Sequence, residues 1–168
     1  MKKTGISLIE IVIVLGFISV LAVFAFVYID PVTRIKKAND GKRKSDLFKM
    51  QIALGKYYKD NGRYPKSSMI APLYRIVRPD GTIADWGQQW IPYISELPKD
   101  PASKNYVYFA VSNGQAYYIY ASLDIGTKDQ KMCKKDGSVC ESALINGIPS
   151  NACGGVCNYG ISSLNVSP

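Results

Sequence analysis

Residues 6–29 form an almost continuous apolar run, and Glu10 is the only ionisable carboxylate within it. The run is 24 residues long, and a helix needs about 20 residues to cross a bilayer. A secretory signal that is removed after export has a shorter apolar core, of about 7–15 residues. The run therefore predicts a membrane helix, and a plain signal anchor is the simplest alternative to a more specialised role.

The carboxylate of Glu10 needs an explanation of its own. An acidic group inside a membrane segment costs about 2.5–3.5 kcal/mol on insertion scales, so it requires a partner or a function. The nearest positive charges are Lys2 and Lys3, in a short leader that ends at Gly5. A cut after Gly5 would place a new ammonium on Ile6, about one helical turn from Glu10. Copies of such a helix can stack so that the Glu10 of one copy neutralises the amine of the next.

The leader and the start of the run read Lys-Lys-Thr-Gly followed by Ile-Ser-Leu-Ile-Glu-Ile-Val-Ile-Val-Leu. This segment resembles the class III signal of type IV pilins and of their relatives, the major pseudopilins of type II secretion. In that family a prepilin peptidase cuts after the glycine and methylates the new N-terminus. The resemblance implies that residues 1–5 are a leader peptide, that cleavage follows Gly5, and that Ile6 is N-methylated. It also implies that Glu10 directs assembly. The family usually has threonine where Ser7 stands.

Residues 31–61 show the three- and four-residue spacing of apolar side chains that predicts an amphipathic helix. Pro31 favours a kink at the membrane surface, after which the helix resumes. The segment is strongly basic and carries Arg34, Lys36, Lys37, Lys42, Arg43, Lys44, Lys49, Lys56 and Lys59. We expect these residues to form a solvated face of the helix. Anionic lipid headgroups and DNA phosphates are the alternative partners of this face.

The charge and composition of the chain limit its chemistry. The formal net charge is +8, and it becomes +6 if Lys2 and Lys3 are removed with the leader. The chain contains no histidine, which excludes Ser-His-Asp and Cys-His catalysis and metal sites with histidine ligands. We therefore expect a protein that is not an enzyme.

Residues 62–105 contain six prolines and predict a long ordered loop with a turn at Asp80-Gly81. Three aromatic side chains in this loop, those of Trp86, Trp90 and Tyr93, are expected to anchor it on the helix. The reason is that large aromatic side chains dominate protein cores.

Residues 106–144 carry the β-strand signal. Residues 106–111 and 116–121 are rich in aromatic and β-branched side chains, and the Asn113-Gly114 pair between them predicts a hairpin turn. One face of the sheet is expected on the helix and the other toward solvent or a neighbouring molecule. We expect a third strand around residues 137–144 and a loop, held by disulfides, in the tail at residues 145–168.

The four cysteines, Cys133, Cys140, Cys153 and Cys157, all lie late in the chain. An even number of cysteines in an exported region predicts two disulfides. The spacing favours Cys133 with Cys140 and Cys153 with Cys157, and the nested pairing of Cys133 with Cys157 and Cys140 with Cys153 stays open. A zinc site of four thiolates is the rival interpretation, although only one pair has the short gap typical of zinc ligands.

The resemblance also bears on metal binding, because major pseudopilins hold a calcium ion in a loop after the hairpin. The candidate ligands here are Asp124, Asp129 and Asp136, since calcium binds carboxylate oxygens. Their spacing matches no calcium motif, and four lysines crowd them: Lys128, Lys131, Lys134 and Lys135. We expect no resident cofactor. If the chain holds one, calcium is the candidate.

Together these features predict an α+β, pilin-like fold. A long N-terminal helix, with a transmembrane half at residues 6–30 and an amphipathic half at residues 31–61, is expected to pack on a small antiparallel β-sheet. The globular domain then covers residues 31–168. Residues 43–65 and 90–108 add to the resemblance to pilins and pseudopilins.

The resemblance implies a structural subunit of a type IV pilus, with roles in adhesion, motility or DNA uptake, and a major pseudopilin of type II secretion is the alternative. The cysteine-bearing tail favours the surface pilus. The expected partners are further copies of the chain in a filament, the prepilin peptidase, the inner-membrane assembly machinery and membrane lipid, with DNA as a further candidate. The precursor is expected to be a single-pass membrane protein, and the assembled form a cell-surface pilus or a periplasmic pseudopilus.

Overall fold

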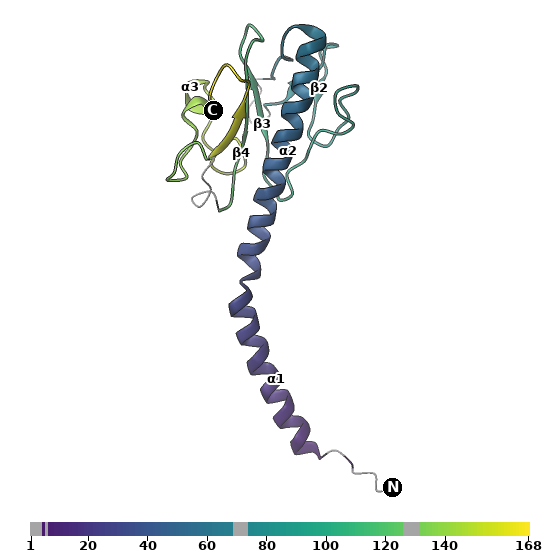
Figure 1. The fold of residues 1–168 in the computed structure, drawn as a ribbon, viewed down its shortest axis with the longest axis vertical. Helices are drawn as coiled ribbons and strands as arrows, with labels where there is room; N and C mark the ends of the chain where they lie inside the picture. Colours follow the sequence, from purple (N-terminus) through teal and green to yellow (C-terminus); the bar gives the residue numbers. More distant parts are fainter. Residues whose placement is uncertain (1–4, 6, 69–73, 126–131) are drawn as a thin grey trace. The chain divides into compact units, whose positions relative to one another are not determined.

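The computed structural model describes residue 5 and residues 7–68, 74–125 and 132–168. The chain divides into two compact units, residues 1–35 and residues 36–168. Helices α1 and α2 are the long elements of Figure 1, and the strands and the short helix α3 belong to the second unit.

Helix α1, Leu8–Ile29, fills most of the first unit. It is interrupted at Asp30, whose φ of 42° lies in the left-handed region. Helix α2, Pro31–Asn61, begins at the next residue. The Asp30 carboxylate accepts a hydrogen bond from the N–H of Thr33 at 3.3 Å, as an N-cap does. Proline suits the first helical position because its missing N–H has no intrahelical partner there. The kink expected at Pro31 is thus an interruption one residue earlier.

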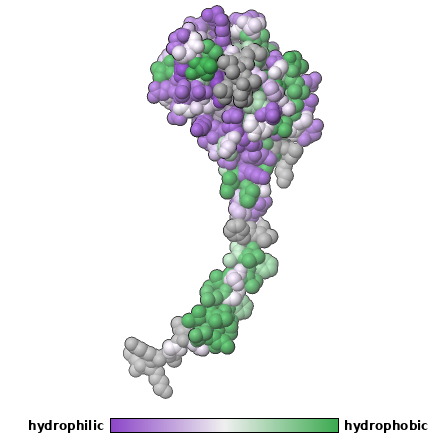
Figure 2. All heavy atoms as spheres, turned by 180° about the vertical axis from the view of Figure 1, so that it is seen from behind, coloured by the Kyte–Doolittle hydropathy of each residue, from purple (hydrophilic) through white to green (hydrophobic). Residues whose placement is uncertain are grey.

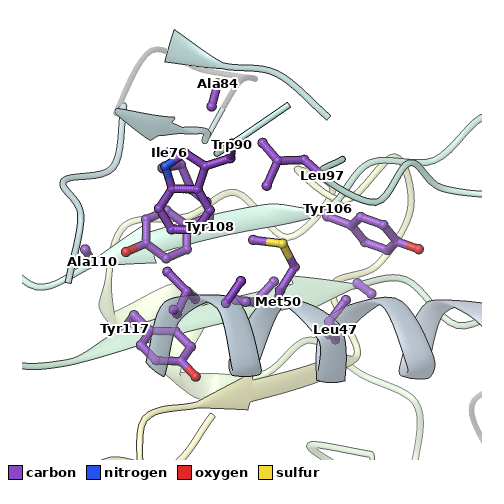
Figure 3. Close-up of a cluster of buried hydrophobic side chains, with 14 of the residues drawn as sticks. Leu47, Met50, Ile76, Ala84, Trp90, Leu97, Tyr106, Tyr108, Ala110 and Tyr117 are labelled. Atoms are coloured by element: carbon purple, nitrogen blue, oxygen red, sulfur yellow. The ribbon is translucent and has the colours of Figure 1, made fainter. Parts of the chain in front are cut away.

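Within the second unit, α2 runs beside the strands (Figure 1), and one apolar face of this helix is buried in the core. Its buried apolar residues recur at helical spacing and are Leu47, Met50, Ala53, Leu54 and Tyr57. Figure 3 shows Leu47 and Met50 directed from the helix toward Tyr106 and Tyr108. The amphipathic helix expected from the sequence is therefore present, and its apolar face packs on the sheet.

The main sheet has three antiparallel strands in the order β3-β4-β5. Strands β3, Val107–Ala110, and β4, Tyr117–Ala121, form the expected hairpin, with Val107 opposite Tyr120 and Ala110 opposite Tyr117. Strand β5, Tyr159–Ser162, pairs with β4. The third strand predicted around residues 137–144 was therefore wrong. That region contains the short helix α3, Glu141–Ile145, and the third strand comes from the tail that was expected to be a loop.

Both faces of this sheet are covered. One face packs on α2, and the other packs on a second cluster that includes Val107, Tyr120, Ala143, Cys140 and Cys153. The expectation that the second face would meet solvent or a neighbour was wrong. The chain segment that carries the disulfides folds over this face and supplies the apolar side chains that bury it.

The proline-rich segment is more regular than expected. It contains a small antiparallel pair, β1, Ile76–Val77, with β2, Ile83–Ala84, joined through the predicted turn, where Gly81 has a φ of 84°. Two of the three aromatic anchors, Trp90 and Tyr93, lie on the helix as predicted, whereas the Trp86 ring packs on Tyr106 at 5.7 Å between centroids. The Trp90 ring stacks on Tyr57 of α2 at 5.5 Å between centroids. The Tyr93 ring meets the edge of Tyr57 at 4.9 Å.

Candidate functional site

The predicted assembly residues lie at the start of the first unit. Gly5 is exposed, and Glu10 lies in the first turn of α1 with its side chain exposed. Ile6, the predicted site of methylation, lies outside the described residues. A carboxylate in the first turn of a helix is favoured by the helix dipole. In the described part of the chain no ion pair involves the Glu10 carboxylate, which suits a contact between chains.

Helix α1 is built for an apolar environment along its whole length. Its 22 residues rise about 33 Å at 1.5 Å per residue, which matches the roughly 30 Å hydrocarbon core of a bilayer. Among the described residues it is the one helix long and apolar enough to cross a membrane. The large apolar side chains that the structure describes in this helix are exposed, for example Leu8 at 80% and Phe24 at 71%. On the face that Figure 2 shows, the hydrophobic helix contrasts with the second unit, whose visible surface is mainly hydrophilic with some hydrophobic patches.

The cysteines form two short-range disulfides. Cys133 pairs with Cys140, and Cys153 pairs with Cys157, with Cα atoms 5.0 Å and 5.3 Å apart. This is the pairing that the spacing favoured. It excludes the nested pairing, and it excludes a zinc site of four thiolates because all four cysteines are in disulfides. Each bridge closes a short loop, and Cys140, Cys153 and Cys157 are fully buried.

Arg43 is the centre of a buried charged cluster that was not among the site residues predicted from the sequence. Its guanidinium, on α2, is fully buried. Its Nε and Nη2 donate to the two oxygens of Asp100 at 2.7 and 3.2 Å. Its Nη1 donates to Asp40 and to Asp124, each at 2.7 Å. Burial opposes the positive charge of Arg43, but these carboxylates outweigh that effect and raise the pKa of the guanidinium above its usual value.

The aspartates of the cluster also bind backbone N–H groups. Asp40 accepts hydrogen bonds from the N–H groups of Asp124 and Ile125 at 2.8 and 2.9 Å. Asp100 accepts one from Ala102 at 2.8 Å. The cluster therefore ties α2 to two loops that lie 57 and 81 residues further along the chain. The sequence had placed Arg43 on a solvated basic face, and that expectation was wrong.

Lys104 completes the cluster from the loop before β3. Its ammonium donates to Asp124 at 2.6 Å and to the carbonyl and hydroxyl oxygens of Ser122, each at 3.1 Å. Burial of Asp124 disfavours its ionised form, but the hydrogen bonds from Arg43 and Lys104 outweigh burial and hold the pKa of this carboxyl below its usual value. Both oxygens of Asp124 are therefore bound by protein cations.

A further buried carboxylate, that of Asp46, lies about one helical turn after Arg43 on α2. Asp46 accepts a hydrogen bond from the Tyr106 hydroxyl at 2.9 Å and pairs with Lys42 at 3.0 Å. Burial, followed by the negative charge of Asp46, raises the pKa of Tyr106 far above its usual value. Tyr106 therefore stays neutral and serves as the donor of this bond.

The two candidate calcium ligands that the structure describes, Asp124 and Asp136, do not belong to a metal-binding group of side chains among the described residues. Asp124 is bound by Arg43 and Lys104, and Asp136 accepts a hydrogen bond from the N–H of Ser138 at 2.9 Å. Asp129 lies outside the described residues. No group of three or more His, Cys, Asp or Glu side chains able to hold a metal occurs in the part of the chain that the structure describes. Asp124, whose two oxygens both bind protein cations, thus does not fit as a ligand of the ion that the resemblance implied.

A signal for the buried Arg43 was present in the sequence. Positions 43, 47, 50 and 54 recur at four, three and four residues, which is the spacing of one helix face. Leu47, Met50 and Leu54 are buried, so a basic residue in register with them is buried too. No comparable signal marks Lys104, because its partners lie in a loop and a strand end.

Comparison with known proteins gives a consistent result. A family model described as "Type II secretion system (T2SS), protein G" matches residues 31–140. The chain is 30% identical to type II secretion system core protein G of Vibrio cholerae over 111 residues, which are 65% of this chain and 72% of that protein. It is 29% identical to the protein of the same name from Escherichia coli over 132 residues, 76% of this chain and 88% of that protein. No solved structure matches the chain significantly.

Proposed function

Because the chain belongs to the type II secretion system protein G family, we propose that it is the repeating subunit of a periplasmic pseudopilus that serves protein secretion. The family match carries this proposal, and it favours the pseudopilin over the type IV pilus that we had taken as the first expectation. The cysteine-bearing tail had favoured a surface pilus. Most of that tail, residues 141–168, lies beyond the matched region.

The proposed role is structural rather than enzymatic. The relatives are named as core proteins of a secretion system, and the expectation of a protein that is not an enzyme agrees with the family. The buried charges around Arg43 are paired with one another and hold the fold together.

The proposed assembly route follows from the exposed apolar surface of α1. The precursor sits in the inner membrane with α1 in the lipid and Lys2 and Lys3 in the cytoplasm, as the positive-inside rule favours. The prepilin peptidase removes residues 1–5, and the inner-membrane machinery draws the subunit into the filament. Contacts between α1 helices then replace contacts with lipid, since both environments are apolar.

Glu10 supplies the register between subunits in this proposal. The cleaved chain begins at Ile6, whose amine is positive, and Glu10 of a neighbouring subunit neutralises that amine. A buried charge left without its partner costs about 3–5 kcal/mol. A subunit added at the wrong height therefore loses several kcal/mol, so the pair selects one register.

Deletion of the gene in its host tests the pseudopilus against the pilus. We expect the deletion to abolish secretion of proteins into the medium and to leave surface filaments in place, and expression of the intact chain from a plasmid to restore secretion. Loss of surface filaments and of twitching motility, with secretion unchanged, would instead identify a pilus subunit.

A further inference from the structure

The segment that follows β4, residues 122–125, is held at every residue by side chains from distant elements. Asn158 binds Leu123 on both sides, accepting from its N–H at 2.8 Å and donating to its carbonyl at 3.2 Å. Asp40 binds the N–H groups of Asp124 and Ile125. The oxygens of Ser122 and Asp124 bind a cation of the chain itself, the ammonium of Lys104.

The ammonium of Lys104 fills this position. A lysine ammonium has three N–H donors, and three acceptors lie around it: the carbonyl and hydroxyl of Ser122 and one oxygen of Asp124. Its side chain is 19% exposed. Every donor of this largely buried cation is thus satisfied, which makes the arrangement stable without any further ligand.

The same geometry leaves no place for calcium at Asp124. Calcium takes about 6–8 oxygen ligands and relies on carboxylates with free oxygens. Here Arg43 occupies one oxygen of Asp124 and Lys104 the other, at 2.7 and 2.6 Å. Two fixed positive charges beside the carboxylate would also repel a divalent cation.

The loop closed by the Cys153–Cys157 disulfide lies against Lys104 and Ser122. A Cβ atom added at Gly154 would lie 2.9 Å from the Cα of Lys104, and one added at Gly155 would lie 2.6 Å from the Ser122 hydroxyl. The N–H of Asn105 donates to the carbonyl of Cys153 at 2.9 Å. The two glycines therefore let the disulfide loop rest directly on Lys104 and Ser122, and the lysine is part of a built site.

We propose that the ammonium of Lys104, a residue against which the Cys153–Cys157 loop packs, is the permanent cation of the segment after β4. This chain then folds without the calcium ion that its resemblance to major pseudopilins implies. The inference concerns the folding of a single subunit, and it stands whether or not the chain assembles into a pseudopilus.

Thermal unfolding of the full chain in detergent micelles tests the proposal. Near-ultraviolet circular dichroism reports the packing of the buried aromatic side chains, such as Trp90 and Tyr106, in the second unit. We expect wild-type protein to have the same Tm in calcium chloride and in the chelator EGTA. We expect Lys104→Met to lower the Tm by about 5 °C or more, because Asp124 loses a buried partner. Lys135→Met is the matched control, because Lys135 is exposed.

A wild-type Tm that falls in EGTA would overturn the proposal, as would one-to-one calcium binding by calorimetric titration. A Lys104→Met protein as stable as the Lys135→Met control would overturn it too. The comparison of wild-type protein in calcium and in EGTA requires no variant to fold, so the proposal is decided even if Lys104→Met yields no folded protein.

Discussion

At the scale of single residues, Arg43 connects parts of the chain that are far apart in sequence. Its planar fork binds Asp100 through two nitrogens and reaches Asp40 and Asp124 through the third. Lysine has one nitrogen and cannot reproduce this geometry. Arg43 therefore acts as a structural clamp within the subunit, and its charge is not available to lipid or DNA.

Removal of this guanidinium should destabilise the subunit strongly. In Arg43→Met the carboxylates of Asp40, Asp100 and Asp124 lose their shared partner, and we expect the free energy of unfolding to fall by about 3–5 kcal/mol. Lys56→Met, on the exposed side of the same helix, should change it by less than about 0.5 kcal/mol. Denaturant unfolding of the full chain in detergent, followed by tryptophan fluorescence, measures both. Equal stability of the two variants would show that the cluster contributes nothing to folding.

The ion pairs of Arg43 could not be predicted from the sequence, because two of its three partners lie far away along the chain. Its three carboxylate partners lie 3, 57 and 81 residues away. Only the nearest, Asp40, lies on the same helix, where spacing reveals a shared face. The other two are brought in by the folding of loops, for which hydrophobic periodicity carries no information.

At the scale of secondary structure, the parts with a strong local signal were predictable. The apolar run predicted α1, and the aromatic alternation with Asn113-Gly114 predicted β3 and β4. Strand β5 has only four residues, Tyr159–Ser162, and pairs with a strand about 40 residues earlier. Neither its length nor its composition distinguishes it from a loop in the sequence. Its position depends on the fold of the disulfide-bearing segment that precedes it.

Gly155 tests the contact between the disulfide loop and Ser122, the residue after β4, and Gly55 on α2 provides the control. Gly155→Ala would place a methyl group against the Ser122 hydroxyl, and we expect it to lower the free energy of unfolding by about 1–3 kcal/mol, as overpacking does. Gly55→Ala, where an added Cβ meets no atom within 4 Å, should raise it by about 0.5–1 kcal/mol because alanine favours a helix. Denaturant titration of each variant provides the measurement. A neutral Gly155→Ala would mean that the loop does not rest on Ser122.

At the scale of the whole molecule, the stability of the second unit at high pH depends on buried tyrosines that remain neutral. Burial raises the pKa of Tyr120 to about 12, and it also raises the pKa values of Tyr108 and Tyr117. An unfolded tyrosine titrates near pH 10, so the unfolded chain releases these protons first. The stability that the neutral phenols contribute is therefore fully present below about pH 10 and is lost as the pH rises toward the folded pKa values.

We accordingly expect the free energy of unfolding to fall steeply above about pH 10. Tyr120→Phe should make this fall less steep, because one of the protons released on unfolding is gone. Denaturant unfolding at a series of pH values, with tyrosinate absorbance as a second signal, measures the slope. An identical slope in the variant and in wild-type protein would mean that Tyr120 ionises as readily in the folded as in the unfolded chain.

The central claim is that α1 is the assembly element and that Glu10 sets its register. The most direct measurement is the yield of filaments, by electron microscopy, from cells that carry the secretion machinery, together with the mass of the mature N-terminus. We expect Glu10→Gln to be cleaved after Gly5 and to remain in the membrane, with filament yield reduced at least about tenfold, the factor that 1.4 kcal/mol corresponds to. Ser7→Ala, which removes a side chain that makes no capping hydrogen bond, should assemble as wild-type protein does. Normal filament yield from Glu10→Gln would contradict the account.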